Sequence, residues 1–320
     1  MKVKYFLNPL ITFLLQTSLF VVSLTAYSQD SDKTEEDSLY KPSNHKGFHA
    51  GLYVGAFIAN KNTAYIYDGY GFDINGQRNT FENSVLNYQI LNVYGGGLGQ
   101  NDLIAQLLNV GPGDWSFRET DMPVNLKYTT TYLVGLNMRY QINKKSSISL
   151  NINGTKLVVN GKFTISSTLP TTTGLQGQSK INQFTITGAE QRLMFQLGYQ
   201  RILGNHEKLN LMVEGGLNII FSKAQKNQAV LNSDQNNGAN NITIDLMSIY
   251  NQPPYNYYSA KYLIGAGIGA FGGIGMHLTI NPKYTVQLLY NPSYDRISLG
   301  YNPKFKLQHG FGLRIYYNLS

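Results

Sequence analysis

The sequence predicts an all-β protein: an antiparallel, up-and-down transmembrane β-barrel, with eight strands as the main interpretation and ten as the alternative. Three observations predict this fold. From residue 47 onward, apolar and polar residues alternate in eight runs, which is the period of a strand with one apolar face. Several runs exceed the about 9 to 11 residues that a tilted strand needs to cross a bilayer. The links between the runs alternate between short and long.

Residues 1–28 have the pattern of a secretory signal peptide: two lysines, an apolar run and a site with small residues. We expect cleavage after Ser28, with an uncleaved membrane anchor as the alternative. Residues 29–46 are polar and acidic and lack periodicity, which predicts a flexible periplasmic tail. The outer-membrane barrel is then expected to comprise residues 47–320.

Composition excludes several classes of function. The chain contains no Cys, so disulfides and thiolate metal sites are excluded. The net charge of +8 includes two lysines of the signal peptide, and the remaining basic residues are scattered. Nucleic acid is therefore not an expected partner, because phosphate tracking needs clustered basic residues. The sequence contains no metal or cofactor motif, so no metal or cofactor is expected to bind.

The eight runs share one design, in which one face carries large apolar side chains and the other carries Gly and polar residues. In the last run, Leu313 and Ile315 lie on one face and Arg314 on the other. The apolar faces are expected to contact lipid. The runs are 47–59, 127–142, 146–159, 189–202, 208–222, 260–278, 284–294 and 305–319.

The links sort by parity. Short links follow the even-numbered runs, at 143–145, 203–207 and 279–283, whereas the links at 60–126, 160–188, 223–259 and 295–304 are longer. Outer-membrane barrels have short periplasmic turns and long external loops. The pattern therefore predicts that both termini are periplasmic and that the long loops are extracellular.

The inward faces are expected to form a closed polar core. An eight-stranded barrel is just wide enough for side chains to fill it, and a buried charge without a partner is costly. We therefore expect the inward carboxylates and guanidinium groups to pair, with Glu214 or Glu190 beside Arg314, as a stabilising network rather than a conduction path. The expected lumen network is Arg139, Glu190, Arg192, Glu214 and Arg314.

Tyrosines concentrate near the ends of the predicted strands. An aromatic ring with a polar tip suits the headgroup boundary, so these residues are expected to form girdles around the barrel. The expected girdle consists of Tyr128, Tyr132, Tyr140, Tyr199, Tyr284, Tyr290 and Tyr317.

The first long link, residues 60–126, is expected to contain one short helix at 101–110, capped by Asn101 or Asp102. Two roles compete for it: a lid packed over the barrel mouth, which we favour, or an exposed element that binds a partner. Alternatively, residues 65–74 pair with 85–94 as a hairpin, which would raise the strand count to ten. The apolar residues of this loop element are Leu103, Ile104, Leu107, Leu108 and Trp115.

The signal peptide, eight amphipathic runs, alternating links and a final strand that ends the chain resemble the small outer-membrane barrels related to OmpX and the OmpA transmembrane domain. The resemblance is one of architecture, without a shared motif. It implies insertion by the barrel-assembly machinery and contact with outer-membrane lipid and lipopolysaccharide. The chain departs from that family in its long first loop and in its last residue, Ser320, where an aromatic residue is common.

The predicted function is that of a non-enzymatic outer-membrane barrel whose large surface loops bind an unknown ligand or envelope protein, or protect the surface. A transport or export component, or a narrow gated pore, is the alternative, and a lipid-modifying barrel enzyme similar to PagL or PagP comes third. No catalytic residue is assigned. The nearest pairing of His with a hydroxyl, His277 and Thr279, is expected at the periplasmic end, away from outer-leaflet lipid.

Overall fold

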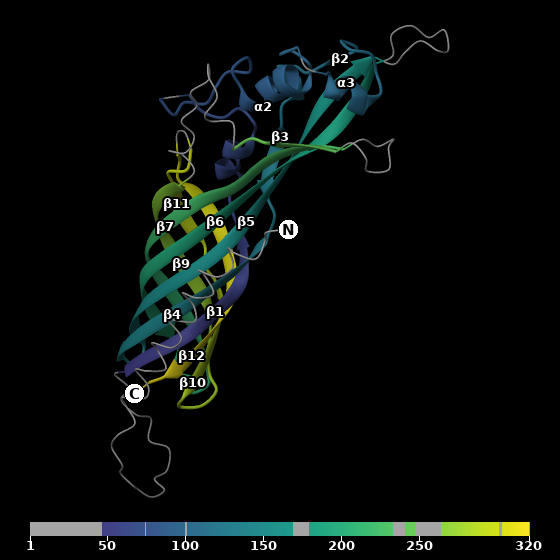
Figure 1. The fold of residues 1–320 in the computed structure, drawn as a ribbon. Helices are drawn as coiled ribbons and strands as arrows, with labels where there is room; N and C mark the ends of the chain where they lie inside the picture. Colours follow the sequence, from purple (N-terminus) through teal and green to yellow (C-terminus); the bar gives the residue numbers. More distant parts are fainter. Residues whose placement is uncertain are drawn as a thin grey trace, which may run out of the picture.

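The computed structural model describes seven segments of the chain and shows one antiparallel sheet closed into a barrel (Figure 1). The expected signal peptide and N-terminal tail lie outside the described residues. None of the helices in the described part is long and apolar enough to span a bilayer. The described segments are 47–73, 75–99, 101–168, 179–232, 241–247, 264–300 and 303–319.

The sheet contains twelve strand segments and is accompanied by short helices. The strands are β1 (Gly47–Ile58), β2 (Trp115–Ser116), β3 (Val124–Tyr128), β4 (Thr131–Asn143), β5 (Ser146–Thr168), β6 (Ser179–Leu203), β7 (Leu209–Leu231), β8 (Ile242–Asp245), β9 (Ile264–Thr279), β10 (Tyr284–Tyr290), β11 (Ser293–Ile297) and β12 (Lys306–Asn318). The helices are η1 (Lys61–Tyr67), α2 (Val85–Tyr88), η2 (Gln89–Tyr94), α3 (Leu103–Leu108) and η3 (Glu119–Asp121).

The predicted fold class is confirmed, although twelve segments replace the eight predicted strands. The ring runs β1–β4–β5–β6–β7–β9–β10/β11–β12, and β12 closes it by pairing with β1. β10 and β11 keep one register against both neighbours and are separated only at Asn291 and Pro292, where proline has no N–H to donate. β2 and β3 pair only with β5, and β8 only with β7. The closed ring therefore has eight strand positions.

The ten-strand alternative is wrong. Of the residues expected to form an extra hairpin, 65–67 are helical in η1 and 85–94 are helical in α2 and η2. Residues 68–73 belong to no strand, and Phe72 makes only an isolated bridge with Arg78. The Ser84 side chain caps α2 by accepting a hydrogen bond from the Asn87 N–H, and Leu86 and Ile90 are buried one turn apart.

The wall of the ring is apolar outside and polar inside. On β1, Leu52 is 61% exposed whereas its neighbour Tyr53, which points inward, is 2% exposed. The same alternation holds along β4, β7 and β12. A continuous belt of exposed large apolar side chains is unfavourable in water, so the outer face fits the hydrocarbon of a bilayer.

β5, β6 and β7 extend far beyond the ring, as Figure 1 shows, and contain 23, 25 and 23 residues. The expected long links at 160–188 and 223–259 are accordingly shorter, because part of each is strand. Around the extensions lie β2, β3, β8 and the helices that follow η1. We call this assembly the upper domain. Its core includes Leu86, Ile90, Ile104, Phe163, Ile165, Phe184, Ile186 and Leu231.

The expected helix in the first link is present as α3, with Asp102 as its cap. The Asp102 carboxylate accepts hydrogen bonds from the Ala105 N–H and the Trp115 indole N–H, both at 2.8 Å. Ile104 and Leu107 are buried in the upper domain, Leu108 and Trp115 pack against its core, and Leu103 is 39% exposed. α3 is therefore not the lid over the barrel mouth, because its apolar face is covered by the extended sheet.

Candidate functional site: the polar lumen and the segment that fills its mouth

Two charged clusters lie inside the ring. The upper cluster, near the upper domain, is centred on Glu190 and Arg192 of β6, whose ion pair is 2.5 Å long and buried. The other carboxylate oxygen of Glu190 accepts a hydrogen bond from the Tyr128 hydroxyl at 2.6 Å, and Ser222 of β7 also donates to Glu190. The Glu190 carboxylate is thus held by side chains from three strands.

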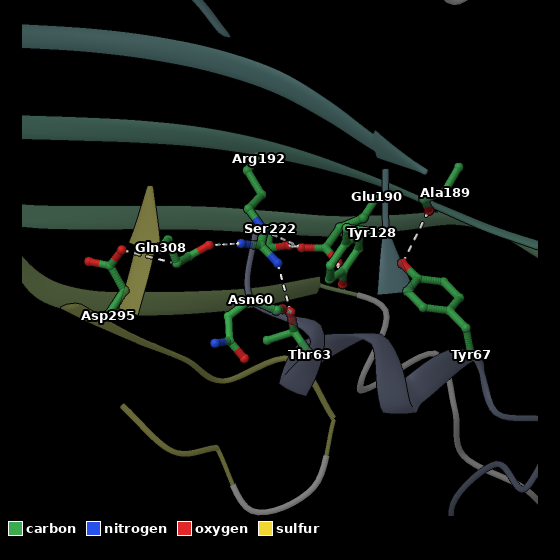
Figure 2. A network of polar contacts seen from close by, with 10 residues as sticks. All are labelled: Asn60, Thr63, Tyr67, Tyr128, Ala189, Glu190, Arg192, Ser222, Asp295 and Gln308. Carbon is green, nitrogen blue, oxygen red and sulfur yellow. Dashed lines mark hydrogen bonds and ion pairs between the residues drawn. The ribbon is translucent and has the colours of Figure 1, made fainter. Parts of the chain in front are cut away.

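Arg192 uses all three of its nitrogens. Nε donates to Glu190, Nη1 donates to the Gln308 side chain at 2.6 Å, and Nη2 donates to Thr63 Oγ1 at 2.8 Å (Figure 2). Gln308 in turn donates to Asp295 at 3.0 Å. The guanidinium therefore links the β6 carboxylate, β12 and the η1 segment in one network.

η1 fills the mouth of the barrel, a role that the sequence analysis did not assign. Tyr67 donates from its hydroxyl to the Ala189 carbonyl at 3.2 Å, and its ring lies against Gly188, where a Cβ would approach a Tyr67 ring atom to 2.3 Å. The Tyr65 hydroxyl donates to the Leu299 carbonyl at 3.3 Å. Figure 2 shows Thr63 and Tyr67 on this segment pointing toward the lumen wall.

An apolar collar surrounds η1. Ala64, Ile66 and Tyr67 pack against inward-facing residues from five strands of the ring. Burial of this kind excludes water from the mouth and stabilises the position of the segment. The collar residues of the ring are Leu157, Val159, Met194, Ile220, Ala224, Leu289 and Ile297, together with Leu299 after β11.

The lower cluster lies toward the short turns and is centred on Glu214 of β7. Arg314 of β12 donates to Glu214 over 2.5 Å, with both side chains fully buried. The second carboxylate oxygen accepts hydrogen bonds from Ser149 at 2.5 Å and from Asn151 at 3.3 Å. Of the two carboxylates that the sequence offered for Arg314, the structure places Glu214 beside it.

Arg139 is the member of the expected network that the structure does not bring to a carboxylate. Its Cζ lies 4.6 Å from the ring centroid of Tyr316, a cation–π contact. Its Nε and Nη1 have no hydrogen-bond partner among the described residues. The lower cluster therefore holds two guanidinium groups for one carboxylate, whereas the upper cluster holds one guanidinium for Glu190 and Asp295.

Tyr128 does not belong to the aromatic girdle. The register against β5 changes by one residue between β4, where Leu133 faces Thr155, and β3, where Tyr128 faces Val159. A shift of one residue sends a side chain to the opposite face of a sheet. Tyr128 therefore points inward to Glu190 instead of outward to lipid.

The other expected girdle residues lie on the outer face. Tyr140, Tyr199, Tyr284 and Tyr317 are exposed near the short turns, and the rings of Tyr284 and Tyr317 lie 5.3 Å apart. Tyr132 is 81% exposed near the opposite end of its strand. Tyr290 is partly covered, because its ring packs on Phe311 and its hydroxyl contacts His309.

Asp295 and Thr63 are network members that the sequence analysis missed. Asp295 was placed in a link, yet the alternation Gln287, Leu289, Ser293, Asp295 continues across Pro292 and would have identified it as inward-facing. It accepts hydrogen bonds from Asn218 at 2.9 Å and from Ser293. No periodicity marks Thr63, because it lies on a short 3-10 helix rather than on a strand.

His277 is also inside the ring, where its ring nitrogen lies 3.0 Å from the Gln287 side chain. Thr279, which the sequence pairs with it, is the last residue of β9 at the end with the short turns. Within the described ranges, no three His, Asp or Glu side chains converge as metal ligands would. The chemistry that the lumen residues do offer is ion pairing and hydrogen bonding that hold a segment in place.

No protein-family model and no curated protein matches this sequence. Solved structures with some similarity include OprG from Pseudomonas aeruginosa (10% identity, 86% of this chain, 94% of that chain, TM-score 0.34). A second is the translocator domain of the autotransporter NalP from Neisseria meningitidis (8% identity, 95% of this chain, 95% of that chain, TM-score 0.23). A third is the toluene transporter TbuX from Ralstonia pickettii (9% identity, 86% of this chain, 89% of that chain, TM-score 0.21). These likenesses are weak, so the fold assignment rests on the strand pairing.

Proposed function

We propose that this protein is an integral outer-membrane barrel with a sealed lumen, whose upper domain is a rigid surface module that binds a ligand or envelope protein outside the cell. The observation that carries the proposal is the Arg192 network, which ties η1 to Glu190 and Gln308. A lumen whose upper mouth is filled by a hydrogen-bonded segment is not suited to conduction. It serves to hold the upper domain on a fixed base.

Several expectations from the sequence support this proposal and remain part of it. The short turns and both described ends, Gly47 and Leu319, lie at the same end of the ring, where the Leu319 N–H donates to the Phe48 carbonyl. This arrangement fits periplasmic termini. Cleavage after Ser28 and insertion by the barrel-assembly machinery stay predictions from the sequence. Eight strand positions fit the OmpX-type architecture. A non-enzymatic role is part of the proposal, because the carboxylates of Glu190, Glu214 and Asp295 each accept hydrogen bonds from neighbouring lumen side chains.

Planar-bilayer conductance tests the sealed lumen. The purified protein should show no discrete openings, and Arg192→Ala combined with Thr63→Val should raise the frequency of openings by releasing η1. Arg314→Lys is the matched control, because it keeps the positive charge beside Glu214 and lies away from η1. Regular openings in the unmodified protein would favour the alternative, a narrow gated pore. Heat-modifiable gel mobility checks that each variant still forms a barrel.

The helix expected at 101–110 does not act as a lid over the lumen in this proposal, because α3 packs in the upper domain. Deletion of residues 101–110 should therefore leave conductance unchanged while it disrupts surface binding. A pulldown from intact cells with the purified protein as bait, compared with this deletion, would identify a ligand of the upper domain. Equal capture by both forms would place the binding surface elsewhere.

A further inference from the structure

A groove of about 470 Å³ lies on the outer wall of the barrel, where the lipid belt meets the upper domain. Cross-strand pairing defines it as two rows. The lower row runs Val134, Gly154, Leu193, Phe221 across β4 to β7, and the upper row runs Lys156, Gln191, Lys223 across β5 to β7. All of these residues lie on the outward-facing parity of their strands.

Gly154 makes the groove hollow. Its cross-strand neighbours Val134 and Leu193 carry side chains on both sides, and it carries none. A Cβ at Gly154 would meet no atom nearer than the Val134 carbonyl oxygen at 4.0 Å, so the space is open. By contrast, a Cβ at the inward-facing Gly135 would clash with Asn153 at 2.1 Å. The absence of a side chain at Gly154 is therefore not required by packing within the protein.

The rim of the groove is cationic. Lys156 and Lys223 are exposed, and two strand spacings place their Cα atoms roughly 10 Å apart. Within the described part of the chain, neither ammonium group takes part in an ion pair, and no acidic residue lines the groove. Each lysine stem is long enough to bring its ammonium to one shared anion above Gln191. Tyr132 stands at the edge, as an aromatic residue at a headgroup boundary does.

We propose that this groove is a specific site for one phosphorylated acyl lipid, with a chain along Gly154 between Val134 and Leu193 and a phosphate on Lys156 and Lys223. Lipid A of the outer leaflet is the source that fits, because the groove lies at the end of the ring that bears the upper domain. The assignment of leaflet rests on the proposed function, since it requires the upper domain to be extracellular. The chemistry of the site, an apolar groove with a cationic rim, does not rest on the proposed function.

Native mass spectrometry of the detergent-purified protein, titrated with lipid A, tests the site. Two lysines near a membrane surface should contribute about tenfold or more to affinity, so Lys156→Gln with Lys223→Gln should lower retention of lipid A by that factor. Gly154→Leu should lower it as well, by filling the groove without a clash. Dephosphorylated lipid A should bind the unmodified protein as weakly as lipid A binds the double lysine variant.

Matched controls separate this site from general lipid coating. Gly215 is also outward-facing with open space, its nearest atom lying at 3.8 Å, so Gly215→Leu should leave retention unchanged. Lys162→Gln with Lys180→Gln removes two charges elsewhere on the extensions and should also have no effect. Equal retention by all variants overturns the site. Equal binding of phosphatidylglycerol and lipid A overturns lipid A as the source. Heat-modifiable mobility distinguishes loss of the site from loss of the barrel.

Discussion

The lower and upper halves of β5 follow one alternation with opposite polarity. From Ser147 to Thr155 the inward side chains are polar, while the outward ones include Ile148 and Ile152. From Leu157 to Ile165 the inward side chains are apolar or Gly, and the outward positions include Asn160 and Lys162. The strand is continuous, so the reversal reflects its surroundings.

This difference shows that the surroundings of each half of β5, and not the strand itself, determine which face carries the apolar side chains. Below Lys156 the outer face meets lipid and the interior is filled by hydrogen-bonded polar groups. Above it, the outer face meets water and the interior is a hydrophobic core closed by the loop helices. β7 crosses the same boundary with a β-bulge, because Gln225 is an extra residue between the pairs Glu190–Ala224 and Ala189–Lys226.

The largest expected effect breaks the upper half alone. Phe163→Ala should destabilise the upper domain by about 3–5 kcal/mol, because the side chain is buried among Phe117 and Phe184. Trp115, the only tryptophan, packs on this core and reports its unfolding by fluorescence, whereas gel mobility reports the barrel. The fluorescence transition should shift and the gel transition should not. Phe311→Ala, on the lipid face, is the control, and a joint shift of both transitions would contradict two independent halves.

A second prediction locates the boundary on β5 between the lipid-facing and the water-facing part of the outer surface. Ile152→Lys places a charge on the outer face between Leu136 and Phe195 and should destabilise the barrel by about 2–4 kcal/mol, if it lies near the bilayer midplane. Asn160→Lys changes the outer face of the same strand above the boundary and should alter stability by no more than about 0.5 kcal/mol. Urea titration in liposomes followed by gel mobility measures both. Equal effects would show that lipid does not end below Lys156.

The smallest expected effect is a pH dependence confined to the upper half. Asp68 pairs with Arg78 over 2.8 Å, but burial raises the pKa of Asp68 above its ordinary value of 3.8, with Arg78 opposing the shift. The folded state therefore favours the protonated carboxyl, and this contribution to stability is lost as pH rises from about 3.8 through the raised pKa.

The Trp115 fluorescence transition should move to lower urea across that pH interval, and Asp68→Asn should reduce the slope. Gel mobility of the barrel serves as the internal control, because the lumen pairs lie in the other half. A slope unchanged in Asp68→Asn would assign the pH dependence to another group.

Much of the ring could be predicted from alternation alone. Residues such as Leu313, Arg314 and Ile315 have only two faces to choose from, and length and link parity distinguish a lipid belt from a soluble core. The sequence left two possible partners for Arg314, Glu214 and Glu190, because both carboxylates lie on inward positions. Choosing between them needs the register of β12 and β7 across the lumen.

The roles of Tyr128 and Thr63 could not be predicted, because they depend on a register shift of one residue and on a contact between distant parts of the chain. Tyr128 carries the same sequence alternation as Tyr132, yet a shift in register turns it inward to Glu190. Thr63 has no periodic neighbours, and its role exists only because Arg192 reaches it from a strand far along the chain. The extensions of β5 to β7 were missed because their apolar stripe changes face at the boundary.

The sequence by itself determined the class of fold, the faces of most strands within the ring and the charged residues that cannot meet lipid, because local alternation encodes burial directly. Only the tertiary structure decided that η1, and not α3, fills the mouth, that Arg139 stays without a carboxylate, and that open space lies over Gly154. Each of these three features depends on which strands lie next to or across from one another in the closed ring. The alternation of a single strand carries no information about its neighbours across the ring.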